Sequence, residues 1–281
     1  MTANGRTVVV PAHNEAAVIA RCLATLVRDA DDGEFGVVVV CNGSTDETAA
    51  TSRRALPSAN VLDLPVASKP AALRAGFAAA PPGAVAVVDA DVEVPARTIR
   101  ALFAVLDGGE AAVSAARPVF ATEQSSWSVR RYYRVWLALP YGGRATVGSG
   151  VFALNQAARD RLGEFPDVLN DDAWVRRAFP PPHRRAVEET FVVHPARTAK
   201  ALIARRARVI DGNRQLSVTL GPDDEGAGLA ALRAGLAARS FGLLDAAAFL
   251  ALTAAARSAA WRRRRRGTTS WSTDTGSREM A

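Results

Sequence analysis

The chain has 281 residues, of which 49% are hydrophobic and 22% charged, so we expect an ordinary globular core. Its two cysteines, Cys22 and Cys41, exclude a disulfide framework and offer no metal-binding spacing, which favours reduced thiols in a cytosolic protein. Residues 1–110 hold 9 Lys+Arg against 13 Asp+Glu, whereas residues 111–281 hold 26 against 15. The basic part indicates phosphate, an anionic membrane surface or nucleic acid nearby.

Short β-branched runs alternate with helical patterns through the first 110 residues. RTVVVPAHNE predicts a strand that ends at Pro11, and apolar residues then recur at helical spacing from Val18 to Val27. FGVVVVCN predicts a second strand, followed by a polar loop and a helix capped by Asp46 or a neighbouring threonine. A third strand, a helix and a fourth strand are expected at 60–65, 69–80 and 84–91. This alternation predicts parallel β-α-β units and an α/β sheet with helices on both faces.

The remainder of the chain is less regular. We expect a strand at 111–120, a helix at 125–141, a glycine-broken extended segment at 145–155 and a helix from Asp171, with C-terminal helices over 226–261. The polar residues after the arginine run 262–266 predict disorder. The predicted organisation is a domain over 1–215, with halves 1–110 and 111–215, a helical segment over 216–266 and a tail over 267–281.

Polar residues follow three of the predicted strands: AHNE, CNGSTDET and DAD. In doubly wound sheets, ligands bind beyond these carboxyl ends. If the fourth strand continues, Asp89 and Asp91 point the same way and can face one ligand. Two carboxylates suit Mg²⁺ or Mn²⁺, which combine few protein ligands with substrate phosphates. A loop that caps a helix is the alternative for this motif alone.

The ordered set VVVPAHNE, VVVVCNGSTDET, SKPAALRAGF and VAVVDADVEVP, followed by GSGVFALN and NDDAWVRR, resembles the family 2 glycosyltransferases over about residues 6–215. The resemblance implies a GT-A fold, which is a Rossmann-like, mostly parallel sheet. It implies a hexosyltransferase-type enzyme that moves a sugar from a nucleotide-sugar donor to a hydroxyl acceptor with inversion. It also implies a divalent metal cofactor, Mg²⁺ or Mn²⁺.

The same resemblance assigns roles to residues of this sequence. The metal would be held by Asp91, with Asp89 at the ribose or a metal-bound water. Asn42 stands where the family has an aspartate that binds uracil, and Cys41 and Arg74 also depart from the pattern, so the donor base stays open. The nucleotide-sugar site would comprise Pro11, His13, Asn14, Glu15, Asn42, Asp46, Lys69 and Asp89.

An acid pair, Asp171 and Asp172, begins the helix expected after residue 170. By resemblance, Asp172 is the base that takes the proton from the acceptor hydroxyl, and the like charge of Asp171 raises its pKa. Two acids at a helix N-terminus can also be purely structural. On the acceptor and phosphate side we place Arg205, Arg208 and Trp174. Because only Arg208 matches the Gln-x-x-Arg-Trp pattern of processive relatives, we favour transfer of a single sugar.

The C-terminal sequence raises the question of a membrane. Residues 240–256 are apolar but short for a span and contain Asp245, so a helix on the surface of a membrane, with 262–266 at anionic headgroups, is one option. A helix packed on the catalytic domain is the other. We expect no secretory signal, a cytoplasmic protein that can be peripheral at the membrane, and no nucleic-acid partner.

Two other functions remain open on the sequence. A sugar nucleotidyltransferase shares the fold type, but VVVPAHNEAA lacks the glycine-rich loop with which such enzymes begin. A non-catalytic, nucleotide-sugar-binding or membrane-associated scaffold with a degenerate site is favoured by the departures at Cys41, Asn42, Arg74 and Val209.

Overall fold

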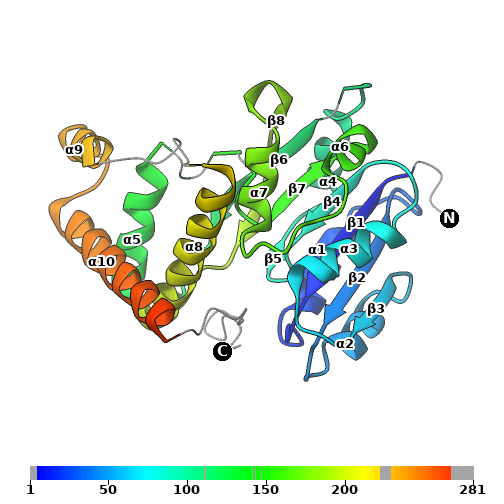
Figure 1. Ribbon diagram of the computed structural model, residues 1–281, viewed down its shortest axis with the longest axis horizontal. Coiled ribbons are helices and arrows are strands. Elements are labelled where there is room, and N and C mark those ends of the chain that lie inside the picture. Colours follow the sequence, from blue (N-terminus) through cyan, green and yellow to red (C-terminus); the bar gives the residue numbers. More distant parts are fainter. Residues whose placement is uncertain are drawn as a thin grey trace. The chain divides into compact units, whose positions relative to one another are not determined.

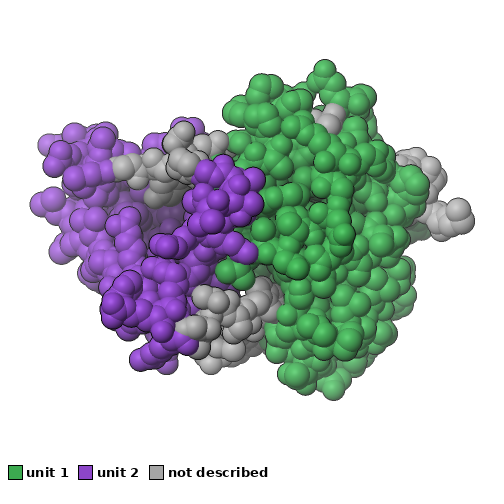
Figure 2. Space-filling view, in the orientation of Figure 1, with its two compact units in different colours: residues 1–119, 145–193, 280 green, residues 120–144, 194–279, 281 purple. Residues whose placement is uncertain are grey.

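The computed structural model describes residues 5–110, 112–140, 142, 144–145, 147–221 and 229–266 (Figure 1). The chain divides into two compact units (Figure 2). Unit 1 contains residues 5–119 and 145–193, and unit 2 contains 120–144 and 194–266, within the described residues. The tail that the sequence predicts to be disordered, 267–281, lies outside the described residues.

Unit 1 begins with the predicted alternation of strands and helices. Its elements are β1 (Thr7–Ala12), α1 (Ile19–Val27), β2 (Gly36–Asn42), α2 (Thr48–Ala55), β3 (Asn60–Leu64), α3 (Lys69–Ala79) and β4 (Val85–Val88). The second half adds β5 (Val92–Glu93), α4 (Ala96–Ala104), β6 (Val113–Phe120), β7 (Val151–Leu154), α6 (Gln156–Leu162), α7 (Asp171–Ala178), the 3₁₀ turn η1 (Pro181–His183) and β8 (Arg184–Val193).

The strands form one sheet of eight, in the order β3-β2-β1-β4-β7-β6-β8-β5. The first four are mutually parallel, whereas β7 runs antiparallel to both β4 and β6. β1, β4 and β7 are buried along their whole length, which is why their sequences are nearly continuous apolar runs. This is the α/β arrangement, with helices on both faces and further helices at the C-terminus, that the sequence predicts.

Helix α3 packs directly on the centre of the parallel strands. A Cβ atom on Gly76 would lie 2.4 Å from Cγ1 of Val9 and 3.3 Å from Cγ2 of Val40, so a glycine at this position allows close helix–sheet packing. Ser68 caps the helix by accepting the Ala71 N–H, at 3.2 Å. The contact fixes the N-terminal end of α3, and therefore Lys69, beside the strand ends.

Unit 2 is helical. It comprises α5 (Trp127–Ala138), α8 (Ala199–Leu220), α9 (Leu229–Ala237) and α10 (Leu243–Arg265), and α10 packs on both α5 and α8. Of the aromatic residues of α5, Tyr132 and Tyr133 belong to the core and are buried beside Ala196 and Leu202, whereas Trp127 is 55% exposed. The strand predicted within 111–120 and the helices predicted within 125–141 and 171–179 are confirmed as β6, α5 and α7, and positions 111 and 141 lie outside the described residues.

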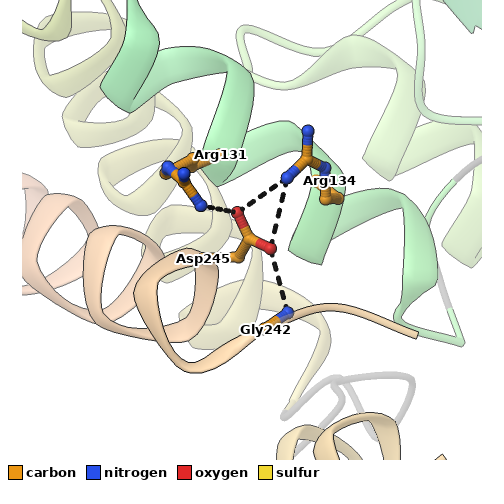
Figure 3. A network of polar contacts seen from close by, with 4 residues as sticks. All are labelled: Arg131, Arg134, Gly242 and Asp245. Carbon is orange, nitrogen blue, oxygen red and sulfur yellow. Dashed lines mark hydrogen bonds and ion pairs between the residues drawn. The ribbon is translucent and has the colours of Figure 1, made fainter. Parts of the chain in front are cut away.

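Two buried aspartates tie α10 into this helical unit. Asp245, whose side chain is 4% exposed, binds Arg131 at 2.7 Å and Arg134 at 3.1 Å, and it accepts the Gly242 N–H at 2.9 Å (Figure 3). Burial opposes the ionisation of Asp245, but these hydrogen bonds outweigh it and lower its pKa. At the other end, Asp211 on α8 binds Arg264 at 2.7 Å. Two arginines of the 262–266 run, Arg263 and Arg264, therefore form ion pairs with Asp211 of α8.

Candidate active site

The carboxylates of Asp89 and Asp91 lie on a turn. β4 ends at Val88, and residues 90 and 91 form a turn before β5 begins at Val92. The expectation of a strand that continues through Asp89 and Asp91 is therefore wrong, because a turn separates β4 from β5, which pairs with β8. Asp89 and Asp91 are both partly exposed, whereas Ala90 between them is buried.

Lys69 joins Asp89 to the acid pair that lies 82 residues further along the chain. Its Nζ atom is 2.7 Å from Oδ1 of Asp89 and 3.0 Å from Oδ1 of Asp171. All three side chains are largely buried, with exposed fractions of 19%, 29% and 6% for Lys69, Asp89 and Asp171. The carboxyl end of β4, the N-terminus of α3 and the N-terminus of α7 thus meet at one ionic cluster.

The charges in this cluster perturb one another. Burial alone would lower the pKa of Lys69, but the Asp171, Asp89 and Asp172 carboxylates outweigh it and raise that pKa. Burial, opposed by Lys69 and assisted by Asp89, raises the pKa of Asp171. Burial and the charge of Asp171 raise the pKa of Asp172 to about 6. A carboxyl group with such a pKa can accept a proton near neutral pH.

Gly150 lies against the Asp89 residue of this cluster. Its carbonyl oxygen accepts the backbone N–H of Asp89 at 2.8 Å. Its φ is +84°, and a Cβ atom there would lie 2.5 Å from Oδ2 of Asp89. Only glycine combines this left-handed backbone with such close approach to the carboxylate. The sequence motif GSGVFALN points to this residue, but its contact with Asp89 becomes evident only from the fold.

We expect Gly150→Ala to lower catalytic efficiency by about 10- to 100-fold, because a displacement of about 1 Å in a reacting constellation has effects of that order. The new methyl group must displace the Asp89 carboxylate and strain the backbone. Gly163→Ala is the matched control, since Gly163 also has positive φ, at +61°, but a Cβ atom added there would meet no described atom within 4 Å. Equal losses of activity in steady-state assays of the two variants would contradict the assignment.

Hydrogen bonds link the loops that follow β1 and β2. Oδ1 of Asn14 accepts the Thr45 N–H at 2.8 Å, and Ser44 Oγ accepts the Asn14 N–H at 3.1 Å. Asn14 has a φ of +53°, a conformation that asparagine tolerates better than most residues. The Nδ1–H of His13 donates to the backbone oxygen of Asn42. These contacts hold residues 13–15 at the carboxyl edge of the sheet.

Two residues that were expected to contact the nucleotide, Asn42 and Asp46, form hydrogen bonds with other groups of the protein. Asn42 is 1% exposed; its Nδ2 donates to Ala12 O at 2.8 Å and its Oδ1 accepts the Ser68 N–H at 3.1 Å. The carboxylate of Asp46 accepts the N–H groups of Ala16 and Thr48, at 3.1 and 3.0 Å. Asp46 therefore joins two loops and supports the start of α2. These contacts explain an asparagine in place of an aspartate at position 42 without any nucleotide.

Arg74 and Trp174 contact the segment that leads to the acid pair. Arg74 Nη1 donates to the backbone oxygen of Phe165 at 2.7 Å and to Oδ1 of Asp167 at 3.0 Å. The half-buried ring of Trp174 packs on Phe165, with centroids 5.1 Å apart. Arg74 lies on α3, as does Lys69, so this helix contacts both the acid pair and the segment before it. The sequence shows Arg74 only as a departure from a family pattern.

The remaining predicted residues are placed as follows. Glu15 is buried, and Pro11 is buried within β1. Arg205 and Arg208 are partly buried on α8 of unit 2, and their role stays a prediction. Both cysteines are free thiols in buried positions. Burial, helped by the charges of Asp91 and Asp89, raises the pKa of the Cys22 thiol, which keeps it protonated.

The donor groups at the β4 end fit a hard divalent cation. The described residues contain no group of three or more His, Cys, Asp and Glu side chains arranged around one point. Mg²⁺ and Mn²⁺ need no such cage, because they take one or two carboxylates together with substrate phosphates. Oδ2 of Asp171 is also buried without a hydrogen-bond partner among the described residues. The cluster therefore contains a carboxylate oxygen that Lys69 does not bind and that can act as a ligand.

Among the solved structures that resemble this one are three glycosyltransferase-fold relatives of different identity. A mannosyltransferase from Pyrobaculum calidifontis, in complex with GDP-Man and Mn²⁺, is 25% identical, with 92% of this chain and 75% of that chain covered and a TM-score of 0.56. Glucosyl-3-phosphoglycerate synthase from Mycobacterium tuberculosis is 21% identical, covering 81% and 84%, with a TM-score of 0.54. TarS of S. aureus is 20% identical, covering 73% and 64%, with a TM-score of 0.52.

A search of curated proteins returns no match. The model of glycosyl transferase family 2 matches residues 7–160, which is more than half of the 281 residues. The matched region contains the polar ends of β1, β2 and β4, Lys69 and the Gly150 segment. The chain therefore belongs to glycosyl transferase family 2.

Proposed function

We propose that this glycosyltransferase moves a single sugar from a nucleoside diphosphate donor to a hydroxyl acceptor with inversion, using a divalent metal and Asp172 as the base. The observation that carries the proposal is the bridge of Lys69 to both Asp89 and Asp171. It joins the strand end suited to a metal and phosphates to the helix that bears a carboxyl group with a raised pKa.

The β4 turn would serve the donor. Asp91 and Asp89 would hold Mg²⁺ or Mn²⁺, whose charge stabilises the departing diphosphate. Lys69 is already positioned beside Asp89, at 2.7 Å, and can donate to a phosphate or ribose oxygen when a donor enters. The mannosyltransferase, which is 25% identical, was determined with GDP-Man and Mn²⁺, and this supports a sugar nucleotide and the same class of ion here.

Asp172 would serve the acceptor. Its Oδ1 accepts the Ala173 N–H at 2.6 Å, and a carboxylate so held can take the proton of a hydroxyl within hydrogen-bond reach. As the proton leaves, the hydroxyl oxygen forms a bond to the anomeric carbon while the bond to the diphosphate breaks. Attack on the side opposite the leaving group inverts the anomeric centre. Asp171 contributes by raising the pKa of Asp172 to about 6.

The residues at the ends of β1 and β2 would surround the nucleotide. Pro11 near the end of β1 and His13, Asn14 and Glu15 in the loop after it would border the nucleotide, and Asp46 supports this loop from the segment before α2. Because the Asn42 amide is committed to Ala12 and Ser68, the base would be recognised by the loop residues around it. Trp174, Arg205 and Arg208 would belong to the acceptor and phosphate side, which suits a lipid, polysaccharide or small-molecule hydroxyl. The protein would act in the cytoplasm.

The donor hypothesis predicts stabilisation by a sugar nucleotide that depends on the metal. We expect one or more of GDP-, UDP-, ADP- and dTDP-sugars to raise the melting temperature in the presence of Mn²⁺ and to do so less in EDTA. A ligand at 100 times its Kd stabilises by about 2.7 kcal/mol. Asp91→Asn should abolish the metal-dependent part of the shift, and Asp32→Asn, an exposed change outside the site, should leave it intact.

The scaffold alternative makes a different prediction when turnover is measured beside the thermal shift. A degenerate, non-catalytic protein would bind the nucleotide but release no nucleoside diphosphate with any acceptor, and Asp172→Ala would change nothing. An enzyme is supported if the native protein releases nucleoside diphosphate and Asp172→Ala does not, while the donor still raises the melting temperature of that variant. An absence of any shift across the donor panel with Mn²⁺ would contradict both alternatives.

A further inference from the structure

Helix α10 presents one continuous exposed face. Exposed residues recur every three or four positions from Leu243 to Arg265, which is the spacing of one side of a helix. The first two thirds of this face are apolar, and large side chains stand far out of the surface: Leu243 is 78% exposed, Leu244 63% and Leu250 49%. We call this surface the α10 outer face.

The last third of the same face is basic. Arg257, Arg262 and Arg265 are exposed beside Trp261, which is 48% exposed. The guanidinium of Arg265 lies 4.0 Å from the centroid of the Trp261 ring. Asp245, the acid within α10, is buried on the other side. The α10 outer face thus combines an apolar strip with positive charge and carries no carboxylate.

The opposite side of α10 is fixed within unit 2. Asp245 binds Arg131 and Arg134 of α5 (Figure 3). Arg264 binds Asp211 of α8 at 2.7 Å. By length and hydropathy α10 passes the test for a helix that could span a membrane. A span would break these ion pairs and place Asp245 in hydrocarbon, where a carboxylate is costly. The ion pairs therefore favour a helix that lies on a surface and does not cross it.

We propose that the α10 outer face binds the surface of an anionic phospholipid membrane. The leucines enter the boundary between headgroups and acyl chains, Trp261 lies at the interface, and the arginines contact lipid phosphates. A second copy of the chain fits less well, because the same face on a partner supplies no anion for the arginines. The inference rests on charge and exposure in unit 2 and stands apart from the proposed chemistry of unit 1.

The test is sedimentation of the full chain with vesicles of phosphatidylcholine, with and without phosphatidylglycerol. We expect binding to the anionic vesicles that high salt reverses. Replacing Arg257, Arg262 and Arg265 by Gln should weaken binding about fivefold per arginine, on the order of 100-fold in total. Leu250→Glu should weaken it by at least about tenfold. The control for the arginines is the triple variant Arg28→Gln, Arg53→Gln and Arg54→Gln at exposed positions of unit 1. The control for Leu250→Glu is Val66→Glu, at a residue of unit 1 that is 66% exposed.

Several results would overturn the inference. Binding that is equal on neutral and anionic vesicles, or absent from both, contradicts it. Binding that neither salt nor alkaline carbonate releases indicates a spanning helix. A dimer in analytical ultracentrifugation that Leu250→Glu abolishes, without vesicle binding, assigns the face to a second copy. The thermal shift by the sugar-nucleotide donor is measured on the variants of α10 as well. Because these substitutions lie in unit 2, a normal donor shift with altered vesicle binding separates failure of this inference from failure of the proposed function.

Discussion

Asp172→Asn is expected to lower the rate of sugar transfer by about 10²- to 10⁴-fold, which is the usual contribution of a general base. The amide cannot accept the proton of the acceptor hydroxyl, although it can still accept the Ala173 N–H that Asp172 binds at 2.6 Å. Stability provides the internal control. Since the buried carboxylate is disfavoured by burial and by Asp171, its neutral replacement should not lower the melting temperature at pH 7.

The pH profile of the native enzyme should carry the signature of the same group. The base acts when it is ionised, and the pKa of Asp172 is raised to about 6, so kcat/KM should fall as the pH drops below about 6. The residual activity of Asp172→Asn should lack this limb. Full activity in the variant, or a native acid limb near pH 4, would remove Asp172 from the role of base. Saturating donor and Mn²⁺ are needed at every pH, so that metal binding does not limit the rate.

Lys69→Met should destabilise the protein by about 3–5 kcal/mol, the range measured when one partner of a buried ion pair is removed. The substitution keeps the volume of the side chain but leaves the carboxylates of Asp89 and Asp171 without their shared cation, at 2.7 and 3.0 Å. The control is Lys200→Met, which replaces the other lysine of the chain at an exposed position of unit 2. Chemical denaturation at pH 7 measures the difference between the two variants.

The loss should shrink as the pH falls. Lys69 opposes the rise in the pKa of Asp171, so its removal raises that pKa further and increases the preference of the folded protein for the protonated carboxyl group. Stability of the variant therefore increases toward acid pH. Asp171→Asn in the Lys69→Met background should restore part of the stability, because it removes an uncompensated buried charge. Equal stability of the Lys69→Met and native proteins at pH 7 would show that the bridge does not form.

Sequence alone identified the fold and the family because its strongest signals are local or ordered along the chain. The buried valine runs of β1, β2 and β4 and the polar residues after them follow from parallel strands between helical layers. The elements α4, α6 and β8 were not predicted. QAARDRL and RRAVEETFVV mix apolar and polar residues without a single clear period, whereas ARTIRALFA has Ile99, Leu102 and Phe103 at helical spacing but only over a short segment of 9 residues. Packing against the existing sheet decides their structure.

Contacts between distant segments decided what the candidate residues do. Asp89 and Asp91 were found as a pair, but the sequence did not show that β4 ends at Val88 and that a turn leads from there to β5, which pairs with β8. Asp46 matched a nucleotide pattern and Asn42 replaced an aspartate of the same pattern, yet their hydrogen bonds go to Ala12, Ser68, Ala16 and Thr48.

The sequence by itself therefore determined the order of strands and helices from β1 to β4, the family and the list of acids. Only the tertiary structure decided that Lys69 joins Asp89 to Asp171, that Gly150 borders Asp89, and that arginines 263 and 264 neutralise Asp211. The physical reason is that residue type and spacing fix local conformation, whereas ion pairs and close packing depend on which remote side chains the fold brings within a few ångströms.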